Sequence, residues 1–389
     1  MDRTYFDYAA TTPTDAEVVE AMRPYFNSRF GNPSSIHSFG QEARAGVEAA
    51  REKIASGLGA KPEEIVFTSG GTEADNFALF GTLWANAQKG NHVVTTAIEH
   101  HAILDPARFL EKQGYKVTYV PPDKYGMVSP QDIAAAMTEK TVLVSVMHAN
   151  NEIGTIQPVA EIGRLVRAKG VYFHTDAVQT FGHIPVNVED LQVDLLSLSG
   201  HKFYGPKGVG CLYIRKGTRI LPYLRGGGQE RRRRASTENV PGIVGMAKAF
   251  EICERKMEDE AREQTRLRDK LIAELPKRID RVYLNGHPQK RLPNNVNFSI
   301  EYIEGESMLL NLDMQGFAAS TGSACTSGDL EPSHVLLAVG QPHELCHGSI
   351  RLTIGRFTKE EEIDRFLDTF PGIVKKLRSM SPLYEEKTT

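Results

Sequence analysis

The sequence Ser-Leu-Ser-Gly-His-Lys-Phe-Tyr-Gly-Pro occupies residues 197–206 and overlaps a mostly apolar run at residues 193–198. Such a run is typical of a buried strand, so Lys202 lies just past a strand end, beside hydroxyl and imidazole side chains. Lysine prefers open surface, and one fixed between a strand and a Gly-Pro turn suits Schiff-base formation with a carbonyl cofactor. The alternative is an exposed loop lysine, and this stretch alone does not separate the two.

A second strand end adds a carboxylate. Residues 171–179 read Val-Tyr-Phe-His-Thr-Asp-Ala-Val-Gln, an apolar strand that ends near Asp176. Lys202 follows 202 − 176 = 26 residues later, which leaves room for one more strand between them. An aspartate can pair with a pyridinium nitrogen and a lysine can hold an aldehyde, so the two together fit pyridoxal phosphate.

The two stretches resemble fold-type I pyridoxal-phosphate enzymes of the class V aminotransferase group, and the lysine stretch resembles that of cysteine desulfurases. The resemblance spans nearly the whole chain and rests on several separated motifs. It implies an α/β fold, with a mainly parallel doubly wound sheet in a large domain and a smaller α+β domain. We expect the large domain at residues 15–255 and the small domain at residues 1–14 and 256–389.

The pattern along the chain favours the same fold class. Apolar strand-like runs alternate with helical patterns, as is typical of parallel βαβ units. The predicted strands are at residues 64–68, 92–98, 115–121, 141–147, 171–175, 193–198 and 208–214. The predicted helices are at about residues 40–57, 130–137, 158–169, 242–274 and 360–378, and residues 281–303 contain strands of the second domain.

Composition narrows the class of protein. A chain of 389 residues exceeds the usual size of one core, and its hydrophobic and charged fractions are ordinary for a globular protein. A net charge of −3 gives no indication of nucleic-acid or membrane binding. Four cysteines without CxxC spacing argue against a disulfide framework or a metal site. No signal peptide is recognisable, so we expect a cytoplasmic enzyme.

A glycine turn follows the strand at residues 64–68. The chain continues as Ser69-Gly-Gly and enters a helical pattern at Thr72, an arrangement that directs backbone N–H groups at an anion. The alternative is a plain βα turn in which Thr72 caps the helix. The resemblance places the cofactor phosphate here, at Gly71 and Thr72, and also assigns Ser199 and His201 to cofactor binding.

Three polar residues follow other strands. His100 comes after the strand at residues 92–98, and the resemblance makes it the ring that stacks on the cofactor and moves protons, for which a near-neutral pKa is suited. By the same resemblance Asn151 contacts the cofactor or the substrate, and Gln179 binds the phenolic oxygen of the cofactor. The alternatives are asparagines that cap a loop and an exposed glutamine.

Two further segments carry candidate substrate contacts. Residues 31–37 read Gly-Asn-Pro-Ser-Ser-Ile-His, a turn cluster that in the family lines the substrate pocket, and Asn32 and His37 match it. Arg351 matches the family arginine that binds the substrate carboxylate, since a guanidinium can donate two parallel hydrogen bonds to a carboxylate. We expect Arg356 to be structural.

Residues 225–239 contain four consecutive arginines, at residues 231–234. Such a run can mark an anion or nucleic-acid surface, but the rest of the chain has no basic stripe, so a solvated loop is favoured. The segment resembles a family loop whose threonine reaches the cofactor phosphate of the neighbouring subunit, and Thr237 matches it. A homodimer is therefore implied. The family usually has glycine before this threonine, where this chain has Ser236.

Residues 320–334 are small, polar and glycine-rich around Cys325. Neither strand nor helix is favoured there, so we expect an exposed thiol on a mobile loop, and a thiolate in that setting can attack. A chance surface cysteine is the alternative. The stretch resembles the cysteine loop of the longer-loop, iron–sulfur-assembly group of desulfurases, with Thr321 in place of the usual serine.

The resemblance implies a cysteine desulfurase that converts L-cysteine to L-alanine and keeps the sulfur on Cys325 as a persulfide. Lys202 would remove the α-proton and His100 would return one. The sulfur would pass to an iron–sulfur scaffold protein or to another acceptor for thio-cofactors. The alternatives are a selenocysteine lyase or another class V aminotransferase. A scaffold protein without activity is a further alternative, but the joint presence of Lys202, Asp176, His100 and Cys325 disfavours it.

Overall fold

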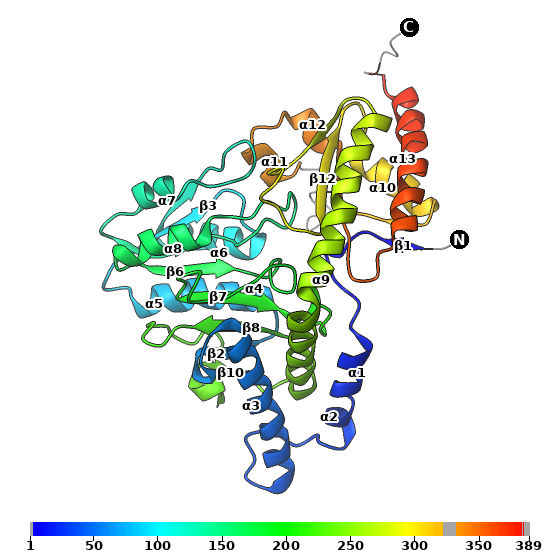
Figure 1. Cartoon of the computed structure of the whole chain (residues 1–389). Helices are drawn as coiled ribbons and strands as arrows, with labels where there is room; N and C mark the ends of the chain where they lie inside the picture. Colours follow the sequence, from blue (N-terminus) through cyan, green and yellow to red (C-terminus); the bar gives the residue numbers. More distant parts are fainter. Residues whose placement is uncertain (1–2, 322–331, 383, 385–389) are drawn as a thin grey trace.

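A computed structural model describes residues 3–321, 332–382 and 384 of the chain. At its centre is a seven-stranded sheet in the order β2-β8-β7-β6-β5-β3-β4 (Figure 1). All neighbours pair in parallel except at β8, which runs antiparallel to β2 and β7. The strands are β2 (Ile65–Thr68), β3 (His92–Thr96), β4 (Lys116–Val120), β5 (Thr141–Ser145), β6 (Tyr172–Asp176), β7 (Leu195–Ser199) and β8 (Gly210–Ile214). The predicted mainly parallel α/β sheet is confirmed.

Side chains of the sheet alternate between two cores because successive residues of a strand point to opposite faces. In β8, Cys211 and Tyr213 join the first core, whereas Leu212 and Ile214 join the second. The first core is covered by α3 (Ser38–Leu58), α7 (Pro130–Ala136), α8 (Val159–Ala168) and the first part of α9 (Val240–Arg278). The second is covered by α4 (Gly71–Asn76), α5 (Thr82–Ala85) and α6 (His101–Lys112). Burial on both faces explains why β2, β5, β7 and β8 consist mostly of apolar residues.

A third, smaller core lies beside the sheet. Its antiparallel strands are β11 (Val282–Leu284), β12 (Asn295–Ile300) and β14 (Ser349–Thr353), and it is packed by the second half of α9, α10 (Gly305–Met314) and α13 (Glu360–Met380). Figure 1 shows α9 running through both parts of the molecule. The predicted domain boundaries stay a prediction, since the cores share this helix.

The N-terminal segment also joins the cores. Strand β1 (Thr4–Tyr5) pairs in parallel with β13 (Phe317–Ala318). Phe6 is buried in the smaller core, whereas Tyr8 is buried in the first core of the sheet. The segment therefore crosses from one core to the other within three residues.

The remaining described elements are short. They are α1 (Ala16–Met22), α2 (Pro24–Asn27), α11 (His334–Ala338), α12 (His343–His347), β9 (Gly228–Gln229) and β10 (Arg234–Ala235), with the 3-10 turns η1 (Pro62–Glu64), η3 (Gly200–Lys202) and η4 (Glu230–Arg232) and the π-helical turn η2 (Phe77–Gly81). None of the described helices combines the length and the apolar character needed to cross a bilayer.

Arg356 is a buried junction between distant segments. Its Nη1 donates to Asp15 at 2.6 Å and its Nε donates to Glu260 at 2.5 Å. The guanidinium carbon lies 4.0 Å from the centre of the Tyr204 ring, and only 7% of the side chain is exposed. This arrangement agrees with the structural role expected for Arg356.

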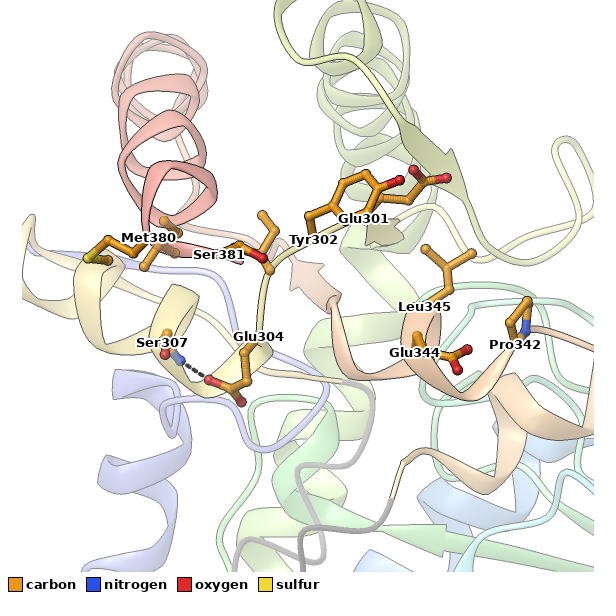
Figure 2. A pocket seen from close by; sticks show the side chains of 11 residues that line it. Glu301, Tyr302, Glu304, Ser307, Pro342, Glu344, Leu345, Met380 and Ser381 are labelled. Carbon is orange, nitrogen blue, oxygen red and sulfur yellow. Dashed lines mark hydrogen bonds between the residues drawn. The ribbon is translucent and has the colours of Figure 1, made fainter. Parts of the chain in front are cut away.

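A groove of about 710 Å³ opens on the smaller core, between α10, α12 and the end of α13 (Figure 2). Its lining mixes apolar side chains such as Leu345 and Met380 with glutamates. Glu304 caps α10, because its carboxylate accepts the backbone N–H groups of Glu306 and Ser307. Among the described lining residues, none is a predicted site residue, so this groove is separate from the site below.

Candidate active site

The predicted site residues gather at one edge of the large sheet. Strands β2 and β7 both run antiparallel to β8, so they run in the same direction as β3, β5 and β6. The carboxyl ends of these five strands therefore meet at one edge, where ligands of open α/β sheets bind. Asp176 ends β6, Lys202 ends the turn after β7, and His100 follows β3.

The amine of Lys202 is held by the N-terminal segment. Its Nζ donates to the backbone oxygens of Ala9 and Ala10, at 2.5 and 2.9 Å. The amide of Gln179 donates to the same Ala9 oxygen at 3.0 Å. The structure thus brings Gln179 and Lys202 together. Two backbone carbonyls, which the sequence did not indicate, form one wall of the site.

Asp176 is a buried carboxylate with one fixed oxygen. Its Oδ1 accepts the backbone N–H of Val178 at 2.8 Å, and 8% of the residue is exposed. Burial raises the pKa of Asp176 to about 6, while the Val178 hydrogen bond and the Lys202 ammonium oppose that rise. The carboxylate is therefore ionised at neutral pH and can face a cationic ring nitrogen.

His100 caps α6 with its ring. Its Nδ1 accepts the backbone N–H of Ala102 at 3.1 Å, which leaves the proton of the neutral ring on Nε2. Burial, together with the nearby charge of Lys202, lowers the pKa of His100 to about 4. The ring is neutral at pH 7, and burial places its pKa below the near-neutral value expected from the sequence. His100 and Thr72 line one cavity of about 770 Å³.

The glycine turn after β2 opens a continuous helical run over residues 71–85. A Cβ atom added to Gly71 would lie 2.8 Å from the Val178 side chain and 3.5 Å from the Cβ of Ser199. The Val178 contact is too close for a Cβ, so glycine is what lets the turn approach the segment after β6. The first N–H groups of the run, at Gly71 and Thr72, therefore lie beside Ser199, at a helix start that favours a phosphate.

His201 completes the wall next to Lys202. Its Nδ1 lies 3.1 Å from the hydroxyl of Thr11, and burial together with the charge of Lys202 lowers its pKa to about 4. The chemistry of these groups fits pyridoxal phosphate, which needs an anion-binding turn, a carboxylate, an amine and a neutral ring.

Arg351 lies in β14, at the boundary with the smaller core. Its Nη2 donates to the Asp7 carboxylate at 2.8 Å, and its Nη1 donates to the backbone oxygen of Asn151 at 3.1 Å. Its Nε is buried and has no hydrogen-bond partner among the described residues. Arg351 and Asn151 are thus adjacent, and the buried Nε is left without a partner among the described residues.

Some predicted residues are not brought to this group by the described contacts. Asn32 is exposed, and its carboxamide oxygen accepts from the backbone and hydroxyl of Ser34. Thr237 is exposed and lines a small cavity with Ser69. Cys325 lies outside the described residues. The roles of these three residues stay predictions.

The structure adds a buried glutamate that sequence reasoning missed. Both oxygens of Glu99 accept the backbone N–H of Met147, at 3.0 and 3.1 Å, and Thr96 donates to it at 2.7 Å. Burial raises the pKa of Glu99 to about 8, although these hydrogen bonds oppose the rise. Its position just before two histidines gave the appearance of a polar loop.

A buried histidine and aspartate lie beneath Asp176. His174 lies between the hydroxyls of Ser145 and Ser197, at 2.9 and 3.0 Å, and 3.6 Å from the Asp75 carboxylate. Burial, with Asp176 nearby, raises the pKa of Asp75 well above its usual range. The sequence does contain a sign that Asp75 is buried. The apolar residues Ala78 and Leu79 follow it at three and four positions, which is the spacing of one helix face.

The prediction of a solvated arginine run is only partly correct. Arg231 and Arg232 are exposed. Arg234 is not, because 14% of its side chain is exposed and it forms two hydrogen bonds to Glu73, at 2.6 and 3.0 Å. Ser236, at the position where the family usually has glycine, has a backbone φ of 93°, a value that favours glycine.

Comparison with known proteins agrees with this geometry. The sequence profile of the aminotransferase class-V family matches residues 4–366 of this chain. A cysteine desulfurase IscS of Dictyoglomus turgidum is 57% identical over 382 residues, which cover 98% of this chain and 97% of that protein. The chain belongs to the class-V aminotransferase family.

Solved structures of similar proteins carry the same fold. A NifS-like protein aligns with a TM-score of 0.91 and 40% identity, covering 96% of this chain and all of that one. A structure of SspA in complex with cysteine aligns with a TM-score of 0.80 and 35% identity, covering 91% of this chain and 99% of that one. Within the class-V aminotransferases, the chain is thus similar to cysteine desulfurases.

Proposed function

We propose that this chain is a pyridoxal-phosphate-dependent cysteine desulfurase that converts L-cysteine to L-alanine and retains the sulfur as a protein persulfide. The observation that carries the proposal is the convergence of Lys202, Asp176 and His100 at one sheet edge, with Arg351 beside them. High identity to proteins named cysteine desulfurase over nearly the whole chain supports the same conclusion.

Each residue has a separate task. When bound, pyridoxal phosphate withdraws electrons from the α-carbon of an amino acid. Gly71 and Thr72 would hold its phosphate, Asp176 its ring nitrogen and Lys202 its aldehyde carbon. The Lys202 amine would take the proton from the α-carbon of the substrate, and its hydrogen bond to the Ala9 carbonyl keeps it at the site.

The other residues place the substrate and handle its protons. Arg351 binds the substrate carboxylate through its guanidinium, which lies next to Asn151. Asp7 and the Asn151 carbonyl fix the orientation of the guanidinium. The neutral His100 ring would hold its proton on Nε2 and donate it when alanine forms.

Cys325 is the proposed sulfur acceptor. Its thiolate attacks the substrate sulfur, so that a sulfur–sulfur bond forms while the carbon–sulfur bond of the substrate breaks. Protonation of that carbon gives alanine, and in sum L-cysteine and the Cys325 thiol become L-alanine and a Cys325 persulfide. The three described cysteines are unsuited to this role, because all are buried and burial raises their pKa values.

The test is incubation of the purified protein with L-cysteine, followed by assay of alanine and mass spectrometry of the protein-bound persulfide. Cys325→Ala should abolish the persulfide yet leave pyridoxal-phosphate uptake intact. Cys211→Ala, which changes a buried thiol of β8, is the matched control and should still form the persulfide. Desulfuration by Cys325→Ala at the parent rate would show that another nucleophile acts.

We further propose that the enzyme works as a cytoplasmic homodimer and passes its sulfur to an iron–sulfur scaffold protein or another acceptor. The dimer rests on the match of Thr237 to a loop that reaches the neighbouring subunit in the family. Sedimentation of the cofactor-loaded protein tests it, and a monomer that retains full activity would contradict a shared site.

A further inference from the structure

The turn proposed to bind the cofactor phosphate contains a negative charge of its own. Glu73 lies in the first turn of the helical run, directly after Gly71 and Thr72. Its carboxylate reaches back and accepts the backbone N–H of Ser69 at 2.8 Å. Only 9% of this side chain is exposed, so water screens its charge poorly. An uncompensated carboxylate here would repel a phosphate dianion.

Arg234 neutralises that carboxylate. Its Nε and Nη2 donate to the two oxygens of Glu73, at 2.6 and 3.0 Å, in the paired geometry that makes arginine–carboxylate contacts strong. Burial raises the pKa of Glu73, but the hydrogen bonds from Arg234 and Ser69 outweigh burial and hold it below its usual range. Glu73 is therefore ionised and paired at neutral pH.

The loop that carries Arg234 is itself held at a second point. Glu230 accepts two hydrogen bonds from Arg51, each of 2.8 Å, and the backbone N–H of Phe67 at 3.0 Å. Arg51 and Glu230 are both buried. The loop is thus attached to α3 and β2 at Glu230 and to the glycine turn at Arg234, and Thr237 follows three residues later.

We propose that Arg234 is a positioning residue for the cofactor phosphate, which neutralises Glu73 and so lets the turn at residues 69–72 accept a dianion. This inference rests on the proposed function, because it takes pyridoxal phosphate as the ligand of that turn. It also links occupation of the turn to the loop that carries Thr237, since Arg234 lies on that loop and pairs with Glu73 directly after the turn. Arg234 does not contact the reacting atoms, so its effect is on cofactor affinity.

The experiment is a titration of the cofactor-free, full-length protein with pyridoxal 5′-phosphate and, separately, with pyridoxal, which lacks the phosphate. Binding is read from the visible absorbance of the bound cofactor. Arg234→Met should weaken pyridoxal-phosphate binding about tenfold or more, because it leaves Glu73 buried and unpaired. It should leave pyridoxal binding nearly unchanged. Arg234→Lys keeps the charge with fewer hydrogen bonds and should lose less.

A second substitution distinguishes charge from simple loss of packing. Glu73→Gln should bind pyridoxal phosphate as tightly as the parent or more tightly. The double variant Glu73→Gln with Arg234→Met should recover most of the affinity that Arg234→Met loses, because no bare carboxylate remains. Arg378→Met is the matched control, since it removes another buried arginine, in the smaller core, and should not change cofactor affinity.

Three results would overturn the inference. They are parent-like affinity of Arg234→Met, equal weakening of pyridoxal and pyridoxal phosphate, and a double variant as weak as Arg234→Met alone. A parent protein that takes up no pyridoxal phosphate would instead refute the proposed function, and the inference with it. If Arg234→Met fails to fold, the affinities of Arg234→Lys and Glu73→Gln for the two ligands decide the question.

Discussion

Replacing Arg356 by methionine should destabilise the protein strongly while leaving substrate recognition intact. The side chain is 7% exposed, and its partners Asp15 and Glu260 are 11% and 13% exposed. Methionine keeps much of the packing volume but leaves both carboxylates without their cation. Removing one partner of a buried ion pair costs about 3–5 kcal/mol of stability. The variant also lacks the cation–π contact with Tyr204, so we expect the free energy of unfolding to fall by an amount in the upper part of that range.

The assay is urea denaturation of the parent and the variant, followed by far-UV circular dichroism. The matched control is Arg262→Met, because Arg262 and its partner Asp259 are 72% and 82% exposed, and such pairs contribute less than about 1 kcal/mol. If Arg356→Met lowers the free energy of unfolding by no more than the control does, the reasoning is refuted. A large rise in KM for L-cysteine would also refute it, since that effect is expected of Arg351.

Three further outcomes are expected. Glu99→Gln should flatten the dependence of stability on pH. Burial raises the pKa of Glu99 in the folded protein from 4.5 to about 8. The stabilisation that this group gives is therefore full below pH 4.5 and is lost as the pH rises towards 8. Parallel stability–pH curves for parent and variant would contradict this assignment. Ser236→Gly should raise the free energy of unfolding by about 1 kcal/mol, because glycine relieves the positive φ, and unchanged thermal unfolding would argue against strain. Iodoacetamide at pH 7.5 should leave Cys211, Cys253 and Cys346 of the native protein unlabelled, since burial raises their pKa values to about 12, 12 and 11. Mass spectrometry of the peptides would detect labelling of any of the three, which would contradict this prediction.

Most strands of the large sheet were predictable because they are buried on both faces and contain apolar runs, whereas the edge strand β4 is only partly buried. The ends of β6 and β7 were visible for the same reason, and with them Asp176 and Lys202. Parallel strands bring their carboxyl ends together, so residues far apart in sequence could be assigned to one site. Short helices such as α11 were not predicted, because a cap and tertiary contacts rather than a long periodic pattern define them: Ser333 caps α11 and donates to the buried Glu152.

The electrostatic surroundings of the site could not be derived from local patterns. The contact between Arg234 and Glu73 joins residues 161 positions apart, and an arginine run alone gives no sign of which member turns inward. Glu99 looks like a polar loop residue until its backbone donor at Met147 is known. Such residues depend on which segments the fold brings together, and single-residue propensity carries no such information.

The pairing of β1 with β13 constrains the order in which the protein can fold during its synthesis. Thr4 lies opposite Phe317, and 317 − 4 = 313 residues separate them. At roughly 5–20 residues per second, a ribosome needs about 16–63 s to make that interval. Throughout this time the opening strand lacks its partner strand. A nascent chain can thus complete its large sheet, whose last strand ends at Ile214, well before its opening strand can pair.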